Sequence, residues 1–191
     1  MRYRPEHKAE VHERIVKDAS RRVRAEGLSG AAVATVMRDT GLTHGGFYKH
    51  FASKDELLLE SLREAFRDIS DRLAHAAEQS RREAPWKAIV KTYLSVESCD
   101  RVDRGCPLTA LAPEMARVDA GMRGPIFAEL VKYKDRMLPF MPGRRSSDKE
   151  RAFFVIFSTM VGAVEIARVL PVRAAQEKVL AITRDFLLSS F

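Results

Sequence analysis

The sequence contains few cysteines and no long uncharged stretch, and both features limit what the chain can be. Its 191 residues include two cysteines, Cys99 and Cys106, which are too few for a disulfide framework or a zinc site. This usage suits a reducing cytoplasm, where we expect the protein to be located. The most apolar run, residues 152–164, lies between two charged residues and is too short to span a bilayer. The charged N-terminus lacks the apolar core of a signal peptide, so we expect no membrane partner.

Catalytic and cofactor signatures are also missing from the sequence. We find no nucleophile elbow, phosphate-binding loop, dinucleotide fingerprint or group of His, Cys and carboxylate residues at metal-ligand spacing. An enzyme would have to use Cys106 as nucleophile and His75 as base, a pairing that no motif supports. The sequence therefore predicts no enzyme, no metal and no cofactor.

The basic residues are concentrated at one end of the chain. Net charge is +7, and residues 1–54 contain 11 Lys and Arg against 6 Asp and Glu, together with four of the five histidines. A basic excess in one segment is typical of contact with nucleic acid, although a solvated basic surface would have the same composition. The motif within this segment decides between the two interpretations.

Residues 33–54 predict two short helices and the start of a third. Gly41 follows the apolar positions of the first helix and allows a turn with positive φ. Leu42 then offers an apolar contact between the two helices, and Thr43 offers a hydroxyl that can cap the second. Within the second helix, Phe47 is placed to face the core. The residues left to face outward are Thr43, His44, Gly45, Tyr48 and Lys49.

A capping box opens the third helix. Ser53 is followed three residues later by Glu56, and the free backbone amides at such a helix start can hold an anion, to which Lys54 would add a full positive charge. The helix is expected to run to about Ser80, with an apolar stripe that includes Leu58. Such a helix can leave the first group of helices and enter a second bundle, which would make it the mechanical link between them.

These residues resemble the signature of the tetracycline-repressor (TetR) family of one-component bacterial regulators. The matching residues are Gly41, Thr43, Gly45, Tyr48, His50, Phe51, Ser53, Lys54, Glu56 and Leu57. The resemblance covers about the first third of the chain at motif level, and the remainder is similar only in length and helical pattern. Two positions differ from the usual pattern. Met37 stands where the family generally has alanine, and Gly46 should cost the second helix roughly 1 kcal/mol relative to alanine.

The resemblance implies an all-α fold with two domains. Residues 1–52 would form a three-helix, helix-turn-helix DNA-binding domain, and residues 53–191 a helical bundle for ligand binding and dimerisation. The implied function is a DNA-binding transcriptional regulator, a repressor released from double-stranded, near-palindromic operator DNA by an effector. On this resemblance Tyr48, His50 and Lys54 would hold phosphates, and Thr43, His44, Gly45 and Lys49 would reach base edges or adjacent backbone.

The last two predicted helices suggest a homodimer. Ser147 and Glu150 form a second capping box, opening a helix to residue 170 that is apolar on nearly every face and is followed by a helix at 172–189. A helix apolar on most faces must be buried on most faces, and a partner subunit would cover it, although burial within one chain is the alternative. The residues predicted for the dimer interface are Phe153, Phe157, Met160, Val161, Val164 and Phe186.

Cys106 suggests one kind of effector. Pro107 suits the first position of a helix, which makes Cys106 the cap residue, and a thiol at a helix N-terminus near Arg101 and Arg104 can be reactive. A thiol-reactive effector is one hypothesis, and an inert buried cysteine is the other.

A pocket for an unknown small-molecule effector is also expected among the helices of the second half. Its predicted lining is Tyr93, Cys106, Leu111, Met122 and Phe127, any of which can equally be core. The rival function is a constitutive architectural DNA-binding protein, whose second domain would be well filled.

Overall fold

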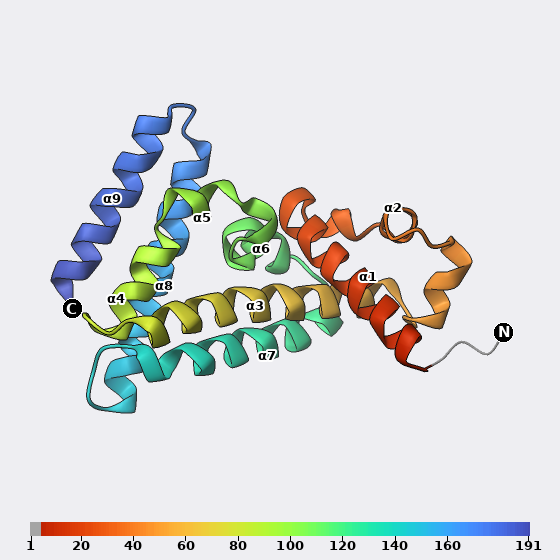
Figure 1. Ribbon diagram of the computed structural model, residues 1–191, viewed down its shortest axis with the longest axis horizontal. Coiled ribbons are helices and arrows are strands. Elements are labelled where there is room, and N and C mark those ends of the chain that lie inside the picture. The colour runs from red at the N-terminus through yellow and green to blue at the C-terminus, as the bar shows by residue number, and fades with distance from the viewer. Residues whose placement is uncertain (1–4) are drawn as a thin grey trace.

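The computed structural model describes residues 5–191, except for the side chains of Pro5 and His44, and all regular structure in this part is helical (Figure 1). The α-helices are α1 (Pro5–Glu26), α2 (Val33–Asp39), α3 (Lys54–Gln79), α4 (Pro85–Tyr93), α5 (Val96–Asp100), α6 (Pro107–Met115), α7 (Ala120–Met137), α8 (Ser146–Val169) and α9 (Arg173–Ser190). Short 3₁₀ segments are η1 (Leu28–Ala31), η2 (His44–Lys49), η3 (Val102–Arg104) and η4 (Leu138–Phe140). The predicted all-α fold is confirmed.

The helices form two groups of unequal size. Figure 1 shows α1 and α2 at one end of an elongated molecule, and α3 running from there into the bundle of α4 to α9. Helix α7 lies along α3, and α8 and α9 lie side by side at the far end. The small core holds nine buried residues from α1, α2, η2, the connection after η2 and the start of α3. The large core holds the buried residues of the bundle together with Val23 and Ala31.

Helix α3 contributes to both cores. Its N-cap is Ser53, whose hydroxyl accepts a hydrogen bond from the backbone N–H of Glu56 at 3.1 Å, so the predicted start is confirmed. The Glu56 carboxylate accepts from the backbone N–H of Ala52 instead of that of Ser53. Leu57 is buried in the small core, and Leu58 is buried in the large one. The predicted domain division after residue 52 therefore separates helices that share packing through α3, and the division stays a prediction.

Helix α7 is continuous from Ala120 although it contains Gly124 and Pro125. Pro125 is the sixth residue of α7, so its missing N–H and its ring affect only the first turns of the helix. Helix α6 likewise contains Pro113.

The start of α8 differs from the capping box predicted at Ser147. The helix begins at Ser146, because Asp148 accepts a hydrogen bond from the backbone N–H of Arg145 at 3.2 Å. Glu150, the expected partner in the box, pairs with Lys134 of α7 instead. Lys134 provides a full charge, which a carboxylate prefers to a single amide.

Helix α8 is a core helix. By length and composition it is the one described helix that could cross a membrane. Its apolar stretch is therefore longer than the uncharged run at residues 152–164. It packs on α9, α6 and α4, and one face is fully within the large core, where Phe153 and Phe157 contact Tyr133 of α7. The apolar composition of α8 is thus accounted for in part by packing within the chain.

Candidate functional site

The turn between α2 and η2 has the geometry that the sequence predicts. Gly41 has φ of +73°, a conformation that only glycine adopts without strain, while a Cβ there would meet no atom within 4 Å. The backbone N–H of Leu42 donates to the carbonyl of Met37 at 2.7 Å and closes the turn. Thr40 reinforces the end of α2 because its hydroxyl donates to the carbonyl of Val36 at 2.9 Å. Gly41 is therefore required for its backbone conformation and not for lack of space.

The second short helix is a 3₁₀ segment, and Thr43 does not cap it through its side chain. Thr43 occupies the N-cap position of η2 with extended backbone, but its hydroxyl makes no capping hydrogen bond, contrary to the prediction. Gly45 and Gly46 together lower the helix propensity of the segment, which favours a short, tighter turn over a regular α-helix.

Aromatic packing fixes the inner side of η2. The ring of Phe51 lies between those of His12 and Phe47, with centroids 4.6 Å and 5.4 Å away. Phe47 is 2% exposed, as predicted, and Tyr48 meets it edge-on at 5.2 Å while remaining 69% exposed. The small core thus holds η2 against α1 and presents Tyr48 outward.

The predicted DNA-contacting residues lie along η2 and the adjoining start of α3. Thr43, Gly45, Tyr48, Lys49 and Lys54 are exposed. His50 is half-buried, and the side chain of His44 lies outside the described part of the chain. Lys54 occupies the first turn of α3, where the free backbone amides of a long helix point outward. These side chains could meet a phosphate backbone.

His50 has an unusual environment at the edge of this surface. Its Nδ1 atom is buried and has no hydrogen-bond partner among the described residues. Burial lowers the pKa of His50 below the ordinary value of 6.5, and the charges of His12, Lys8 and Lys49 lower it further. The neighbouring His12 is held by Glu60, with Nε2 and Oε2 2.8 Å apart. This environment therefore favours the neutral imidazole of His50, which has one ring N–H to donate.

Residues 15–61, which include the turn, η2 and the start of α3, match the model of bacterial regulatory proteins of the tetR family. This segment is the helix-turn-helix DNA-binding part of a TetR-type transcriptional regulator, and the TetR family is not a family of enzymes. No curated protein sequence matches this chain significantly.

Solved structures of transcriptional regulators share the fold over nearly the whole chain. A TetR regulator from Chloroflexus aurantiacus superposes with a TM-score of 0.75 at 23% identity, covering 96% of each chain. One from Cytophaga hutchinsonii gives a TM-score of 0.75 at 17% identity, covering 95% of each. FadR from Bacillus subtilis, solved in complex with stearoyl-CoA, gives 0.67 at 14% identity, covering 94% of this chain and 98% of that one. The bundle therefore has the TetR fold as well as the N-terminal segment.

A groove of about 480 Å³ lies between α6, α7 and α8 in the second half. Of the predicted pocket residues, only Phe127 lines it. Tyr93, Cys106 and Leu111 are buried in the large core, and Met122 packs against that core away from the groove. The sequence missed most of the lining because α6, α7 and α8 are brought together only by the fold. The missed aromatic residues are Tyr133, Phe153, Phe154 and Phe157.

Cys106 is a buried core residue in this structure. It is the N-cap of α6, as predicted, but it is 3% exposed, and burial raises the pKa of its thiol despite contacts with Tyr93 and with backbone N–H groups that lower it. The cations that the sequence suggested do not face it, because Arg101 pairs with Glu97 and Arg104 lies beside Asp103. The arrangement disfavours a reactive thiolate.

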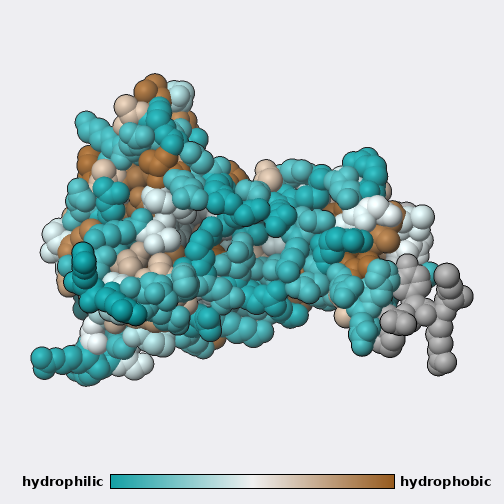
Figure 2. Space-filling view, viewed as in Figure 1, coloured by the Kyte–Doolittle hydropathy of each residue, from teal (hydrophilic) through white to brown (hydrophobic). Residues whose placement is uncertain are grey.

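Most of the predicted dimer interface lies inside a single chain. Phe153, Phe157, Met160 and Val164 are buried in the large core and Val161 is partly buried, whereas Phe186 is 62% exposed. The prediction was wrong for these residues because α8 is apolar on nearly every face, and the face that contains 153, 157, 160 and 164 packs into the core of its own chain. The exposed apolar residues of α8 and α9 are Phe154, Val155, Ile166, Val169, Ile182 and Phe186. Figure 2 shows hydrophobic side chains gathered at this end of the molecule.

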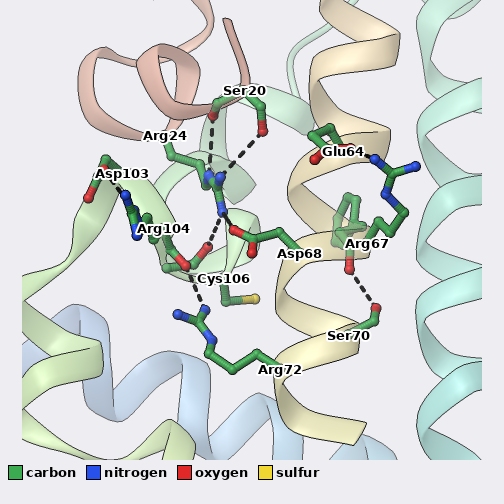
Figure 3. Close-up of polar contacts among 12 residues, drawn as sticks. Ser20, Arg24, Glu64, Arg67, Asp68, Ser70, Arg72, Asp103, Arg104 and Cys106 are labelled. Carbon is green, nitrogen blue, oxygen red and sulfur yellow. Dashed lines mark hydrogen bonds and ion pairs between the residues drawn. The ribbon is translucent and has the colours of Figure 1, made fainter. Parts of the chain in front are cut away.

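A buried arginine joins the N-terminal helices to the bundle. Arg24 of α1 donates to the carbonyl of Gly105 at 3.1 Å, to Asp68 of α3 at 3.0 Å and to the carbonyl of Ser20 at 3.2 Å (Figure 3). Burial lowers the pKa of its guanidinium, and Asp68 raises it in part. Arg72 of α3 holds the same segment by donating to the carbonyl of Arg104. The loop before α6 is therefore fixed to both α1 and α3.

Proposed function

We propose that this TetR regulator is a repressor that binds a near-palindromic operator as a homodimer and is released when a small molecule occupies the groove. The observation that carries the proposal is the position of α6. Leu108 and Ala112, four residues apart on one face of this helix, line the groove. Hydrogen bonds join the DNA-binding segment to the loop just before α6 and to a residue near the end of α6.

The first bond precedes α6 and the second is near its end. Arg24 holds Gly105, the residue before the N-cap. The Glu114 carboxylate accepts a hydrogen bond from the backbone N–H of Leu28 at 2.8 Å. Gly27, with φ of +82°, fits closely against Glu114, since a Cβ there would lie 2.8 Å from a carboxylate oxygen. A displacement of α6 would therefore shift the turn that connects α1 to η1 and α2.

Effector release then follows as a linkage between two binding sites. A ligand that binds more tightly when α6 is displaced shifts the population toward that state, and the operator affinity falls by the same coupling factor. The FadR structure that contains stearoyl-CoA supports the idea that this fold can accept a ligand. The groove also weakens the rival interpretation as a constitutive architectural protein, which would require a filled second domain. The burial of Cys106 weakens the thiol-reactive alternative.

The dimer of this proposal is formed by a second copy packing on the exposed apolar residues of α8 and α9 that lie outside the groove, namely Val155, Ile166, Val169, Ile182 and Phe186. A two-fold arrangement would present two η2 segments to successive major-groove faces. In it, Tyr48, His50 and Lys54 hold phosphates and set affinity and salt dependence. Thr43, His44, Gly45 and Lys49 reach base edges or adjacent backbone.

Operator binding with a permanently filled groove tests the proposal. We expect the purified protein to bind DNA from just upstream of its own gene saturably, as a dimer, in fluorescence anisotropy across a salt series. In Ala112→Phe the added ring enters the groove from α6, and we expect operator affinity to fall at least tenfold with the helix content retained. Ala128→Phe places the same ring on the exposed surface of α7 outside the groove and is the matched control. Equal operator affinity in both variants and in the wild type would contradict coupling through α6.

A further inference from the structure

We propose that the groove selects a hydrophobic organic cation, an inference that rests on the proposed effector function and names the chemical class of the effector. The walls are apolar and rich in aromatic rings from α7 and α8. Phe127 and Phe154 are exposed and Phe153 and Phe157 lie deeper, so rings are available both at the rim and in the wall. Such a lining binds a ligand that is itself mostly apolar.

The charged side chains of the groove are Lys134 and Glu165. Lys134 is already neutralised, because its Nζ contacts Glu150 Oε1 at 2.5 Å and lies 3.8 Å from Asp135. Glu165 forms no ion pair with any residue that the structure describes. Arg168, one turn further along α8, directs its guanidinium away to the carbonyls of Cys99 and Thr109. The uncompensated charge of the groove is therefore negative.

The position of Glu165 decides which ligands can cover it. Glu165 is partly buried beside apolar walls, so a neutral or anionic ligand that covers it would remove water from its carboxylate without replacing that solvation. A cation replaces the lost water with an opposite charge, and the faces of nearby phenylalanine rings attract it further. Gly162, three residues before Glu165, leaves space at this wall, since a Cβ there would meet no atom within 4 Å. A bulky cation can therefore approach the backbone of α8 next to the carboxylate.

An anionic ligand would need a different cation. Arg123 lines an adjoining hollow that shares Leu108 and Phe127 with the groove, but it is not part of the groove itself, and it donates to the carbonyl of Val118. The charge that faces the groove directly is thus Glu165, and this favours the cation.

A pair of probes equal in size and opposite in charge tests the proposal. Tetraphenylphosphonium and tetraphenylborate are titrated into the intact protein by isothermal calorimetry. We expect the phosphonium to bind at least tenfold more tightly than the borate. Glu165→Gln should weaken phosphonium binding about tenfold, whereas Glu78→Gln, which removes an exposed carboxylate of α3 far from the groove, should leave it unchanged. Gly162→Leu, which places a side chain in the open space, should reduce binding of both probes.

Each contrary outcome overturns the proposal. Equal or tighter binding of the borate, or no binding of either probe, would exclude selection of a cation. Full phosphonium binding in Gly162→Leu would place the cation outside the groove. Operator release is measured separately by anisotropy, so that phosphonium binding in the groove without release would contradict the proposed function while the ligand class stands.

Discussion

The N-terminal segment and the bundle arrange their side chains in opposite ways. In the segment, Phe47 and Phe51 are buried while Tyr48 and Lys49 face outward. In the bundle, the hydroxyls of Tyr93 and Tyr133 are buried beside the thiol of Cys106, and Phe127, Phe154 and Phe186 are exposed. The first arrangement suits a hydrated polyanion as partner, and the second suits apolar partners that exclude water.

The difference also appears in where charge is compensated. Lys49 and Lys54 form no ion pair with another described residue, so their charges are available to phosphate. In the bundle, by contrast, the cations beside the apolar helices include pairs such as Lys134 with Glu150 and Arg63 with Glu129. The N-terminal segment therefore offers a partner exposed positive charge, and the bundle offers exposed apolar surface. Substitutions can test each part separately.

The largest effect is expected from the small core. Phe47→Ala should lower the free energy of unfolding by about 3–5 kcal/mol and abolish operator binding, because a ring that holds η2 against α1 is lost. Urea denaturation followed by circular dichroism measures the change. Phe154→Ala, at an exposed position of the bundle, should change it by less than about 0.5 kcal/mol. Similar losses in both variants would show that burial does not distinguish the two positions.

A charge on the exposed face of α9 should separate the subunits. Phe186→Asp is expected to raise the dimer dissociation constant at least about 30-fold, the effect of a strong interface residue, with helix content unchanged. Analytical ultracentrifugation measures the constant. Phe157→Asp places the same charge in the large core and should unfold the protein instead. A Phe186→Asp variant that remains fully dimeric would place the interface elsewhere.

The salt dependence of operator binding should change with one lysine. Lys54→Ala is expected to weaken binding several-fold and to reduce the slope of log K against log salt by about 1, because one phosphate contact is lost. Anisotropy titrations between low and moderate salt measure the slope. Lys178→Ala, on exposed α9, is the control, and an equal slope change there would mean that the effect reflects net charge alone.

A smaller effect concerns pH and stability. The pKa of His50 is lower in the folded protein than its ordinary value of 6.5, so the unfolded chain binds the proton more readily. The contribution of His50 to the free energy of unfolding is therefore fully present above pH 6.5, and it decreases as the pH is lowered through the pKa of the folded protein. Urea denaturation at pH 7.5 and pH 5.5 should show a smaller decrease for His50→Gln than for the wild type or for His75→Gln. The same decrease in all three proteins would contradict this assignment.

The smallest effect is expected at the cysteines. Burial raises the pKa of both Cys99 and Cys106, so neither thiol should react with Ellman's reagent until the protein is denatured. Operator affinity should likewise be unchanged after treatment with an electrophile. Rapid labelling of the native protein that disappears in Cys106→Ser would restore the thiol-reactive effector as a candidate.

The sequence predicted the N-terminal segment well because its structure depends on near neighbours. The turn at Gly41 and the cap at Ser53 are each determined within a few residues, and both are confirmed. The 3₁₀ form of η2 was not predicted, although Gly45 and Gly46 carry the signal of low helix propensity. Which residues contact DNA remains a prediction from the family resemblance.

The bundle was predicted less completely because its packing joins distant residues. Helical spacing separates the face of α8 that contains Phe153 and Phe157 from the face that contains Val155 and Ile166, but it does not say which face is inward. That choice depends on α4, α6 and α9 together. Cys106 shows the same limit, since Arg101 and Arg104 are near in sequence, yet its core neighbours include Tyr93 and Tyr133.

The sharing of α3 between the two cores has a consequence for dissecting the protein. A fragment ending at residue 52 would lack Leu57 and leave the small core open beside Ile15 and Phe47. Extending the fragment through α3 would close that core but expose the stripe of Leu58, Leu62, Phe66 and Ile69 to water. Either fragment would tend to aggregate because it exposes apolar side chains. Fusing this DNA-binding segment to another protein would therefore require that protein to supply an apolar surface that covers the stripe on α3.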